Sequence, residues 1–175
     1  MTQERNNEEQ LKMTFTPNTI EHLGVRMYST LPPVIAELIA NSQDADAHKV
    51  MISLNDTATK EIIVSDDGTG MSFLDINDKF LRIGRNRRVD EGSQLSPGGR
   101  KVIGKKGLGK LSFFGIAHEI EVRTTQNHLR NAFIMRWEDI LSGDDGERQR
   151  DYSPEIKEHD IASQEENGTK QAAPK

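Results

Sequence analysis

The sequence predicts an α+β fold in which a mixed, mostly antiparallel sheet carries helices on one face. Two pairs of strand-like segments, 49–55 with 61–65 and 119–125 with 132–137, are each joined by a short turn, as in β-hairpins. Stretches with apolar residues at helical spacing lie before and between these pairs. The chain has 175 residues, which is enough for one domain with a sizeable core.

The polar residues of the chain concentrate at its two ends. Residues 1–13 predict a mobile N-terminal arm, and residues 141–175 predict a polar C-terminal segment that is partly disordered or truncated, so the expected domain is 14–140. The formal net charge of −5 argues against non-specific nucleic-acid binding by the whole chain. The chain has no cysteine, no signal-peptide pattern and no apolar run near the ~18 residues that span a membrane, so a cytoplasmic protein is expected.

A helix is expected over residues 34–46, after another short one over 16–30. At about 100° per residue, its apolar stripe consists of Ile35, Leu38, Ile39 and Ser42. Glu37, Asn41 and Asp44 are spaced i, i+4, i+7 and stack on the opposite stripe. A carboxylate, an amide and a second carboxylate in a row can hold a metal, orient water and take a proton. An ordinary solvated helix face has the same pattern.

A glycine-rich loop, D-D-G-T-G-M over residues 66–71, directly follows the strand at 61–65. Glycines this dense after a strand indicate a tight loop with close backbone approach. Asp66 can accept a hydrogen bond from an exocyclic amine, while Gly68 and Gly70 let a flat ring approach the backbone. A glycine turn with a solvated pair of aspartates is the alternative. A further helix is expected over residues 72–83.

A second glycine-rich segment, G-K-K-G-L-G-K over residues 104–110, leads into a helix expected at 107–116. Exposed backbone N–H groups and a helix N-terminus form an anion site, and the lysines suit phosphates. A P-loop would need a hydroxyl at the eighth position, where Leu111 stands, and a preceding strand, where a long polar connection lies. That connection, residues 84–106, lacks apolar periodicity, and connections of this length are functional or disordered.

Three segments in this order, E-L-I-A-N-S-Q-D-A, D-D-G-T-G-M and G-K-K-G-L-G-K, resemble the N, G1 and G2 boxes of the GHKL ATPases. That superfamily includes gyrase B, the heat-shock chaperone of the ninety-kilodalton class, histidine kinases and MutL. The helix that ends in D-A-D-A is most similar to those of MutL and the MORC ATPases. The resemblance covers roughly residues 15–140 and implies a two-layer α/β sandwich, the Bergerat fold.

The resemblance implies roles for the residues of the first two boxes. Glu37 would be the general base that activates the attacking water, and Asn41 would ligate Mg²⁺. Asp44 would lie in the same box near the adenine pocket. Asp66 would accept from the N6 amine of adenine, and the base would be flanked by Gly68, Gly70 and Met71. Asp67 stands where the family usually carries asparagine.

The resemblance also implies how the phosphates are held. Residues 84–106 would be the ATP lid. The phosphates would meet the backbone or ammonium groups of Gly104, Lys105, Lys106, Gly107, Leu108, Gly109 and Lys110. Thr169, in N-G-T-K, resembles the G-T of a late box beside the base, although no apolar strand follows it here.

The expected function is Mg²⁺-dependent ATP binding with slow hydrolysis, used as a conformational or dimerisation switch by the head of a larger protein or complex. Two other hypotheses stay open: the chain is a non-catalytic nucleotide-binding interaction module, or it is a DNA-binding protein. The DNA-binding reading rests on a cluster of basic residues, namely Arg82, Arg85, Arg87, Arg88, Arg100, Lys101, Lys105, Lys106 and Lys110. A histidine kinase would need a phosphoacceptor helical hairpin before the domain, for which the N-terminal segment is too short.

Overall fold

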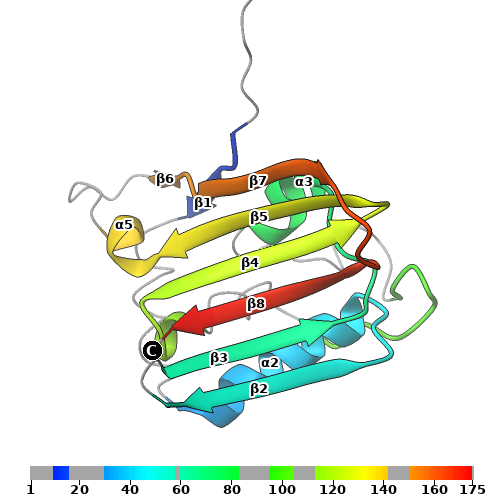
Figure 1. Ribbon diagram of the computed structural model, residues 1–175, viewed down its shortest axis with the longest axis horizontal. Coiled ribbons are helices and arrows are strands. Elements are labelled where there is room, and N and C mark those ends of the chain that lie inside the picture. The colour runs from blue at the N-terminus through cyan, green and yellow to red at the C-terminus, as the bar shows by residue number, and fades with distance from the viewer. Residues whose placement is uncertain are drawn as a thin grey trace, which may run out of the picture.

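A six-stranded antiparallel sheet is the centre of the molecule (Figure 1). The computed structural model describes residues 10–15, 30–57, 60–82, 95–104, 113–141 and 150–174. The strands, in spatial order, are β2 (Val50–Asp56), β3 (Lys60–Asp66), β8 (Gly168–Pro174), β4 (Glu119–Gln126), β5 (Leu129–Arg136) and β7 (Glu155–Ala162). Every neighbouring pair is antiparallel, which confirms the predicted α+β class.

Helices cover one face of the sheet (Figure 1). Helix α2 (Leu31–Asp44) lies behind β2 and β3, while α3 (Phe73–Asp75) continues into a π-helical turn, η1 (Ile76–Phe80), and lies behind β5 and β7. Pro32 and Pro33 occupy the first turn of α2, where the missing N–H groups cost nothing. A short helix, α5 (Trp137–Leu141), follows β5 directly. No described helix is long and apolar enough to cross a membrane.

The hydrophobic core fills the space between the sheet and these helices. Its largest fully buried side chains are Leu11, Met13, Val34, Leu38, Ile76, Leu81, Phe113, Ile120, Val122, Phe133 and Met135. The two hairpins expected from the sequence are present, β2–β3 and β4–β5. Asn127 and His128 both have positive φ in the two-residue turn between β4 and β5, as a type I′ turn requires.

The sheet extends well past residue 140, where the sequence placed the end of the domain. Strands β7 and β8 come from the segment 141–175, and β8 lies between β3 and β4 in the middle of the sheet. Its inner face carries Gln171 and Ala173, both buried, instead of large apolar residues. Strand β8 buries small or polar side chains and β7 leaves nearly all of its side chains exposed, so hydrophobic periodicity does not mark either strand.

The N-terminal segment also enters the core earlier than the sequence indicates. Leu11 and Met13 are almost fully buried, and β1 (Met13–Phe15) pairs with β6 (Arg150–Tyr152) in a small second sheet. Residues 10–13 of the expected arm are therefore part of the packed structure. The rest of that arm, and almost all of the helix expected at 16–30, lie outside the described residues.

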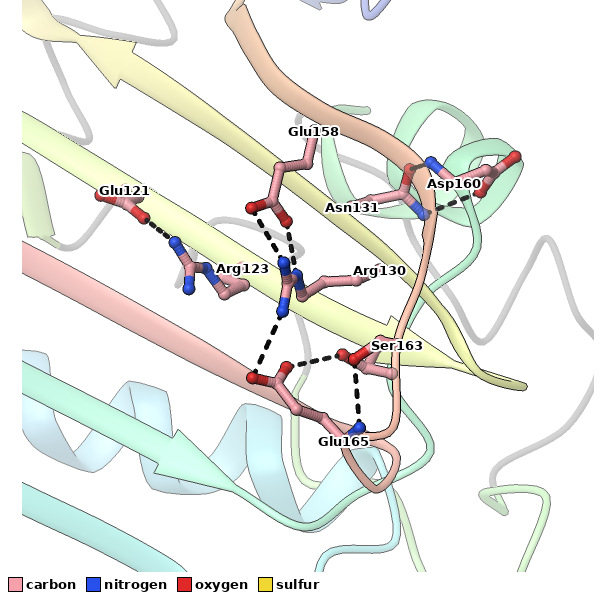
Figure 2. A network of polar contacts seen from close by, with 9 residues as sticks. Glu121, Arg123, Arg130, Asn131, Glu158, Asp160, Ser163 and Glu165 are labelled. Carbon is pink, nitrogen blue, oxygen red and sulfur yellow. Dashed lines mark hydrogen bonds and ion pairs between the residues drawn. The ribbon is translucent and has the colours of Figure 1, made fainter.

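The other face of the sheet carries charged side chains in place of helices. Figure 2 shows Arg130 of β5 between two carboxylates, with Nε 2.5 Å from Glu158 Oε2 and Nη1 3.4 Å from Glu165 Oε1. Arg136 makes a similar pair of contacts farther along β5, with Glu119 and Glu155. These ion pairs are partly exposed, so they add little to stability, and they keep this face of the sheet polar.

Candidate functional site

Helix α2 turns a different stripe toward the core from the one expected. Val34, Leu38 and Ser42 are buried, whereas Ile39 is 41% exposed. At about 100° per residue around the helix axis, Asn41 is rotated by about 20° from Val34 and Glu37 by about 60°. Both therefore lie beside the buried stripe. The polar residues of this helix are consequently half-buried at the edge of the packed layer.

Asp66 explains why Ser42 faces inward. Its carboxylate lies at the end of β3, where Oδ2 accepts from the Ser42 hydroxyl at 2.9 Å and Oδ1 accepts from the Gly68 N–H at 3.0 Å. Burial raises the pKa of Asp66, and the hydrogen bonds from Gly68, Ser42 and Thr169 oppose that rise. A carboxylate has about four acceptor positions, so Asp66 can accept from a further donor.

The glycines after Asp66 are required by the close approach of neighbouring backbone. A Cβ on Gly70, which has φ +66°, would lie 1.9 Å from the carbonyl oxygen of Thr125. A Cβ on Gly68 would lie 2.7 Å from the carbonyl oxygen of Ala45. The loop is also fixed at its end, where the N–H of Met71 donates to Thr124 Oγ1 at 2.9 Å. The loop expected to admit a flat ring is thus a tightly packed turn between α2 and β4.

Thr169 lies beside Asp66, although the two are far apart in the sequence. They are paired across β3 and β8, and Thr169 Oγ1 lies 3.1 Å from Thr124 Oγ1. Gly168 allows this pairing, because a Cβ there would be 2.2 Å from the Asp66 carbonyl oxygen. The G-T of the late box therefore stands next to the first loop, in the β8 strand that the sequence does not reveal.

Asp67, which replaces the usual asparagine, has a structural role. Its Oδ1 accepts from the N–H groups of His48 and Lys49 at 2.7 and 2.8 Å. The hydrogen bond from the Lys49 backbone is the main cause that lowers the pKa of Asp67. An asparagine Oδ1 would accept the same two bonds, so the exchange at this position preserves the turn.

Asp44 lies away from Asp66 and contacts the expected lid. Its Oδ1 accepts from the N–H of Ile103 at 2.7 Å, and its Oδ2 accepts from the N–H of Gly104 at 2.9 Å. The expected place of Asp44 near the adenine pocket stays a prediction, to which these contacts add a structural role. The N–H of Gly104, expected to meet a phosphate, donates to a carboxylate of the protein instead.

Of the remaining residues expected in the site, the structure describes Glu37 and Asn41 but not the glycine loop. Glu37 and Asn41 are half-buried one turn apart on α2. The glycine loop from Lys105 to Lys110 lies outside the described residues, as do 83–94 of the lid, and the helix expected at 107–116 is described only from Phe113. Two residues that support Asp66 and its loop, Ser42 and Thr124, are not among the expected site residues. Ser42 was assigned to the buried stripe without a partner, and no local pattern marks Thr124.

A magnesium ion fits this chain only if the phosphates of a nucleotide supply some of its ligands. Among the described residues, no group of three or more histidines, aspartates or glutamates could hold a metal ion. Mg²⁺ keeps several waters and binds through one or two protein groups plus substrate phosphates. The Asn41 side chain has no hydrogen-bond partner within the described parts of the chain, so its amide oxygen is available as such a ligand.

The chain has an antiparallel sheet with helices on one face. At the end of β3, Asp66 is held by hydrogen bonds and has Gly168 and Thr169 beside it. This arrangement is that of a domain of the GHKL ATPase superfamily. The family described as "Histidine kinase-, DNA gyrase B-, and HSP90-like ATPase" matches residues 28–169, and the chain belongs to this family.

Several curated proteins resemble the chain. It is 40% identical to the "Putative type II restriction enzyme HgiDII" of Herpetosiphon aurantiacus over 132 residues. These residues are 75% of this chain and 21% of that protein. It is 29% identical to the DNA mismatch repair protein MutL of Christiangramia forsetii, over 63% of this chain and 18% of that protein. It is 27% identical to the chaperone protein HtpG of Aromatoleum aromaticum, over 70% of this chain and 22% of that protein. The chain spans about a fifth of the length of these relatives.

Proposed function

We propose that this chain binds ATP with Mg²⁺ and hydrolyses it slowly. The observation that carries the proposal is Asp66, a carboxylate of raised pKa at a strand end, held by Ser42 and Gly68 and paired across the sheet with Thr169. A buried acceptor with unused capacity suits the exocyclic amine of adenine. Membership of an ATPase family supports the same assignment.

Hydrolysis is assigned to the half-buried edge of α2. Glu37 would be the general base that takes a proton from the attacking water, and Asn41, one turn later, would hold the Mg²⁺. Mg²⁺ supplies charge neutralisation at the phosphates, and a base within reach of the water completes what phosphoryl transfer needs. The phosphates are assigned to residues 105–110, because the Gly104 N–H is taken by Asp44, and residues 84–106 are assigned to the lid.

We further propose that ATP acts as a conformational switch that favours dimerisation, in the head of a larger protein. The short coverage of the relatives supports a head with further domains. Turnover by the isolated chain is expected to be slow, because efficient hydrolysis needs groups from those domains.

Two substitutions separate ATP hydrolysis from non-catalytic nucleotide binding. Glu37→Ala should retain ATP affinity while turnover falls at least about a hundredfold, as for loss of a general base. Asp66→Asn should weaken ATP about tenfold to a hundredfold, because the adenine amine loses a charged acceptor. Calorimetry with ATP and Mg²⁺ and a phosphate-release assay measure both. Equal turnover in Glu37→Ala and wild type would exclude Glu37 as the base, and unchanged affinity in Asp66→Asn would exclude the adenine assignment.

A second candidate function is action on DNA by the larger protein. Two relatives are named as a restriction enzyme and a DNA mismatch repair protein, which favours this candidate. The basic residues of 82–110 would contact phosphates, and each contact adds roughly one unit to the dependence of log affinity on log salt. Replacing Arg100 and Lys101 by glutamine should then weaken DNA binding and reduce that slope. Unchanged DNA affinity in the double variant would count against this surface.

A further inference from the structure

Two carboxylates lie at the end of α2 where helices disfavour negative charge. Asp44 is the last residue of the helix and Asp46 follows two residues later, near the C-terminal carbonyls of the helix. The negative end of the helix macrodipole repels acidic groups, and no basic residue stands in the last turn. Both carboxylates are instead surrounded by donors from one distant segment, residues 95–104.

Asp46 binds the first part of that segment. Its Oδ1 accepts from the Ser96 hydroxyl in a short hydrogen bond, and its Oδ2 accepts from the Gly98 N–H at 2.7 Å. Asp46 has φ +61°, a left-handed conformation that is uncommon outside glycine and that directs the carboxylate toward the segment. A Cβ on Gly98 would lie 2.7 Å from Asp46 Oδ1, so glycine is needed for this approach.

Asp44 binds the last part of the segment. Its two carboxylate oxygens take the consecutive N–H groups of Ile103 and Gly104, at 2.7 and 2.9 Å. A Cβ on Gly104 would lie 2.7 Å from Asp44 Oδ2. Two adjacent backbone donors on one carboxylate fix both the position and the direction of the chain at residue 104. Asn41, the expected Mg²⁺ ligand, is only three residues before Asp44.

The segment between these two contacts is itself well ordered by hydrogen bonds. The Ser96 N–H donates to the Arg100 carbonyl at 2.8 Å, and the Arg100 N–H donates back to Ser96 Oγ at 2.9 Å. The Arg100 guanidinium also donates to the carbonyl of Ala47, just after α2. Ser96 and Val102 are buried. Residues 95–104 therefore form a compact turn, which is held by Asp44 at the end of α2 and by Asp46 and the Ala47 carbonyl just after it.

We propose that Asp44 and Asp46 are positioning residues for the nucleotide. They form a clamp, consisting of Asp44, Asp46 and residues 95–104, that fixes the start of the glycine loop relative to Asn41 before ATP binds. The turn at residues 95–104 is thus held in place in advance, which improves both ATP affinity and turnover. This inference rests on the proposed ATP binding.

The clamp itself can be tested without nucleotide. Trypsin cleaves after Arg100 and Lys101, and cleavage of a folded segment follows the population of its opened form. Asp44→Ala and Asp46→Ala should each be cut at these bonds at least about tenfold faster than wild type, because each loses two charge-assisted hydrogen bonds. Mass spectrometry identifies the bonds, and thermal unfolding confirms that the variants fold.

Asp160→Ala is the matched control. Asp160 also has positive φ, 48°, and its carboxylate accepts a hydrogen bond from another strand, Asn131 Nδ2 at 3.1 Å, but it lies on β7 far from the clamp. The rate of cleavage at Arg100 and Lys101 should not change in this variant. Asp46→Asn keeps one acceptor and tolerates the left-handed backbone, so it should restore most of the protection.

The positioning role needs a second measurement. In Asp44→Ala and Asp46→Ala, ATP affinity and turnover should each fall about tenfold, while Asp46→Asn and Asp160→Ala stay close to wild type. Unchanged cleavage in both alanine variants would overturn the clamp, whether or not ATP binds. Faster cleavage with wild-type affinity and turnover would overturn the positioning role. A wild-type protein that binds no ATP would overturn the proposed function and this role, while the cleavage data would still decide the clamp.

Discussion

At the scale of single residues, Asp66 shows how a candidate site residue can cost stability. Desolvation raises its pKa above the ordinary value of 3.8, despite hydrogen bonds from Gly68, Ser42 and Thr169. An acid whose pKa is higher in the folded than in the unfolded state contributes most stability at low pH. That contribution is lost as the pH rises through the folded pKa, so the ionised carboxylate destabilises the fold at neutral pH.

The first prediction concerns the variant that removes this charge. Asp66→Asn should be at least as stable as wild type at pH 7 without nucleotide, and its advantage should shrink toward pH 4. The amide oxygen can accept from Gly68, and the amide nitrogen can donate to Ser42 Oγ, whose hydroxyl then donates to the Leu38 carbonyl 3.1 Å away. Urea unfolding at both pH values measures this. A variant that is clearly less stable at pH 7 would contradict the raised pKa.

Gln171 provides the second prediction at this scale. Its side chain is buried on the inner face of β8, across from Val64 and Val122, and its Oε1 has no hydrogen-bond partner among the residues that the structure describes. An unsatisfied buried acceptor costs about 1–3 kcal/mol. Gln171→Met keeps the volume and should raise the free energy of unfolding by about 1 kcal/mol. A loss of stability in chemical denaturation would show that the carboxamide has a partner, such as a bound water.

At the scale of elements, α2 connects the three parts of the candidate site. Its buried stripe supplies Ser42 to Asp66, its half-buried edge carries Glu37 and Asn41, and its C-terminal end binds residues 95–104 through Asp44. A small rotation of this helix would move all of these groups together. The tight packing of the 66–71 loop against its end opposes such a rotation.

The third prediction tests that packing with two glycines. Gly70 and Gly99 both have positive φ, but only at Gly70 would a Cβ meet backbone, whereas nothing lies within 4 Å of one at Gly99. Gly99→Ala should cost about 1 kcal/mol, the conformational penalty alone. Gly70→Ala should cost about 3 kcal/mol or more, since the β4 backbone must also move. Thermal unfolding compares the two, and equal costs would contradict the close contact with Thr125.

The elements also show what could be predicted from the sequence. The four strands of the hairpins were predicted within three residues at each end, because β-branched and apolar residues bounded by turns identify them locally. The buried stripe of α2 was predicted only in part: Leu38 and Ser42 are buried as expected, but Val34 is buried as well and Ile39 is exposed. The hydrogen bond from Ser42 to Asp66 helps to orient the helix, and periodicity does not contain that contact. Strand β8 was missed because its buried positions, Gln171 and Ala173, owe their burial to neighbouring strands.

At the scale of the whole molecule, β8 joins the two hairpins into one sheet. It pairs with β3 on one side and with β4 on the other, and no other described strand connects them. The candidate site depends on this arrangement, since Asp66, Thr169 and Thr124 come from three adjacent strands. A chain that ends at residue 140 would lack both the connection and Thr169.

The last prediction tests the central position of β8 with two neighbouring alanines. Ala173 is fully buried beside Ile62 on the inner face, while Ala172 is half-buried on the open face beside Ile63 and Glu121. Ala173→Asn should cost at least about 2 kcal/mol, because it places an unpaired amide and extra volume in the core. Ala172→Asn should change stability by about 0.5 kcal/mol or less, since the amide reaches solvent. Urea unfolding measures both. Equal effects would mean that β8 does not separate a packed face from an open one, and Thr169 would then have no fixed place beside Asp66.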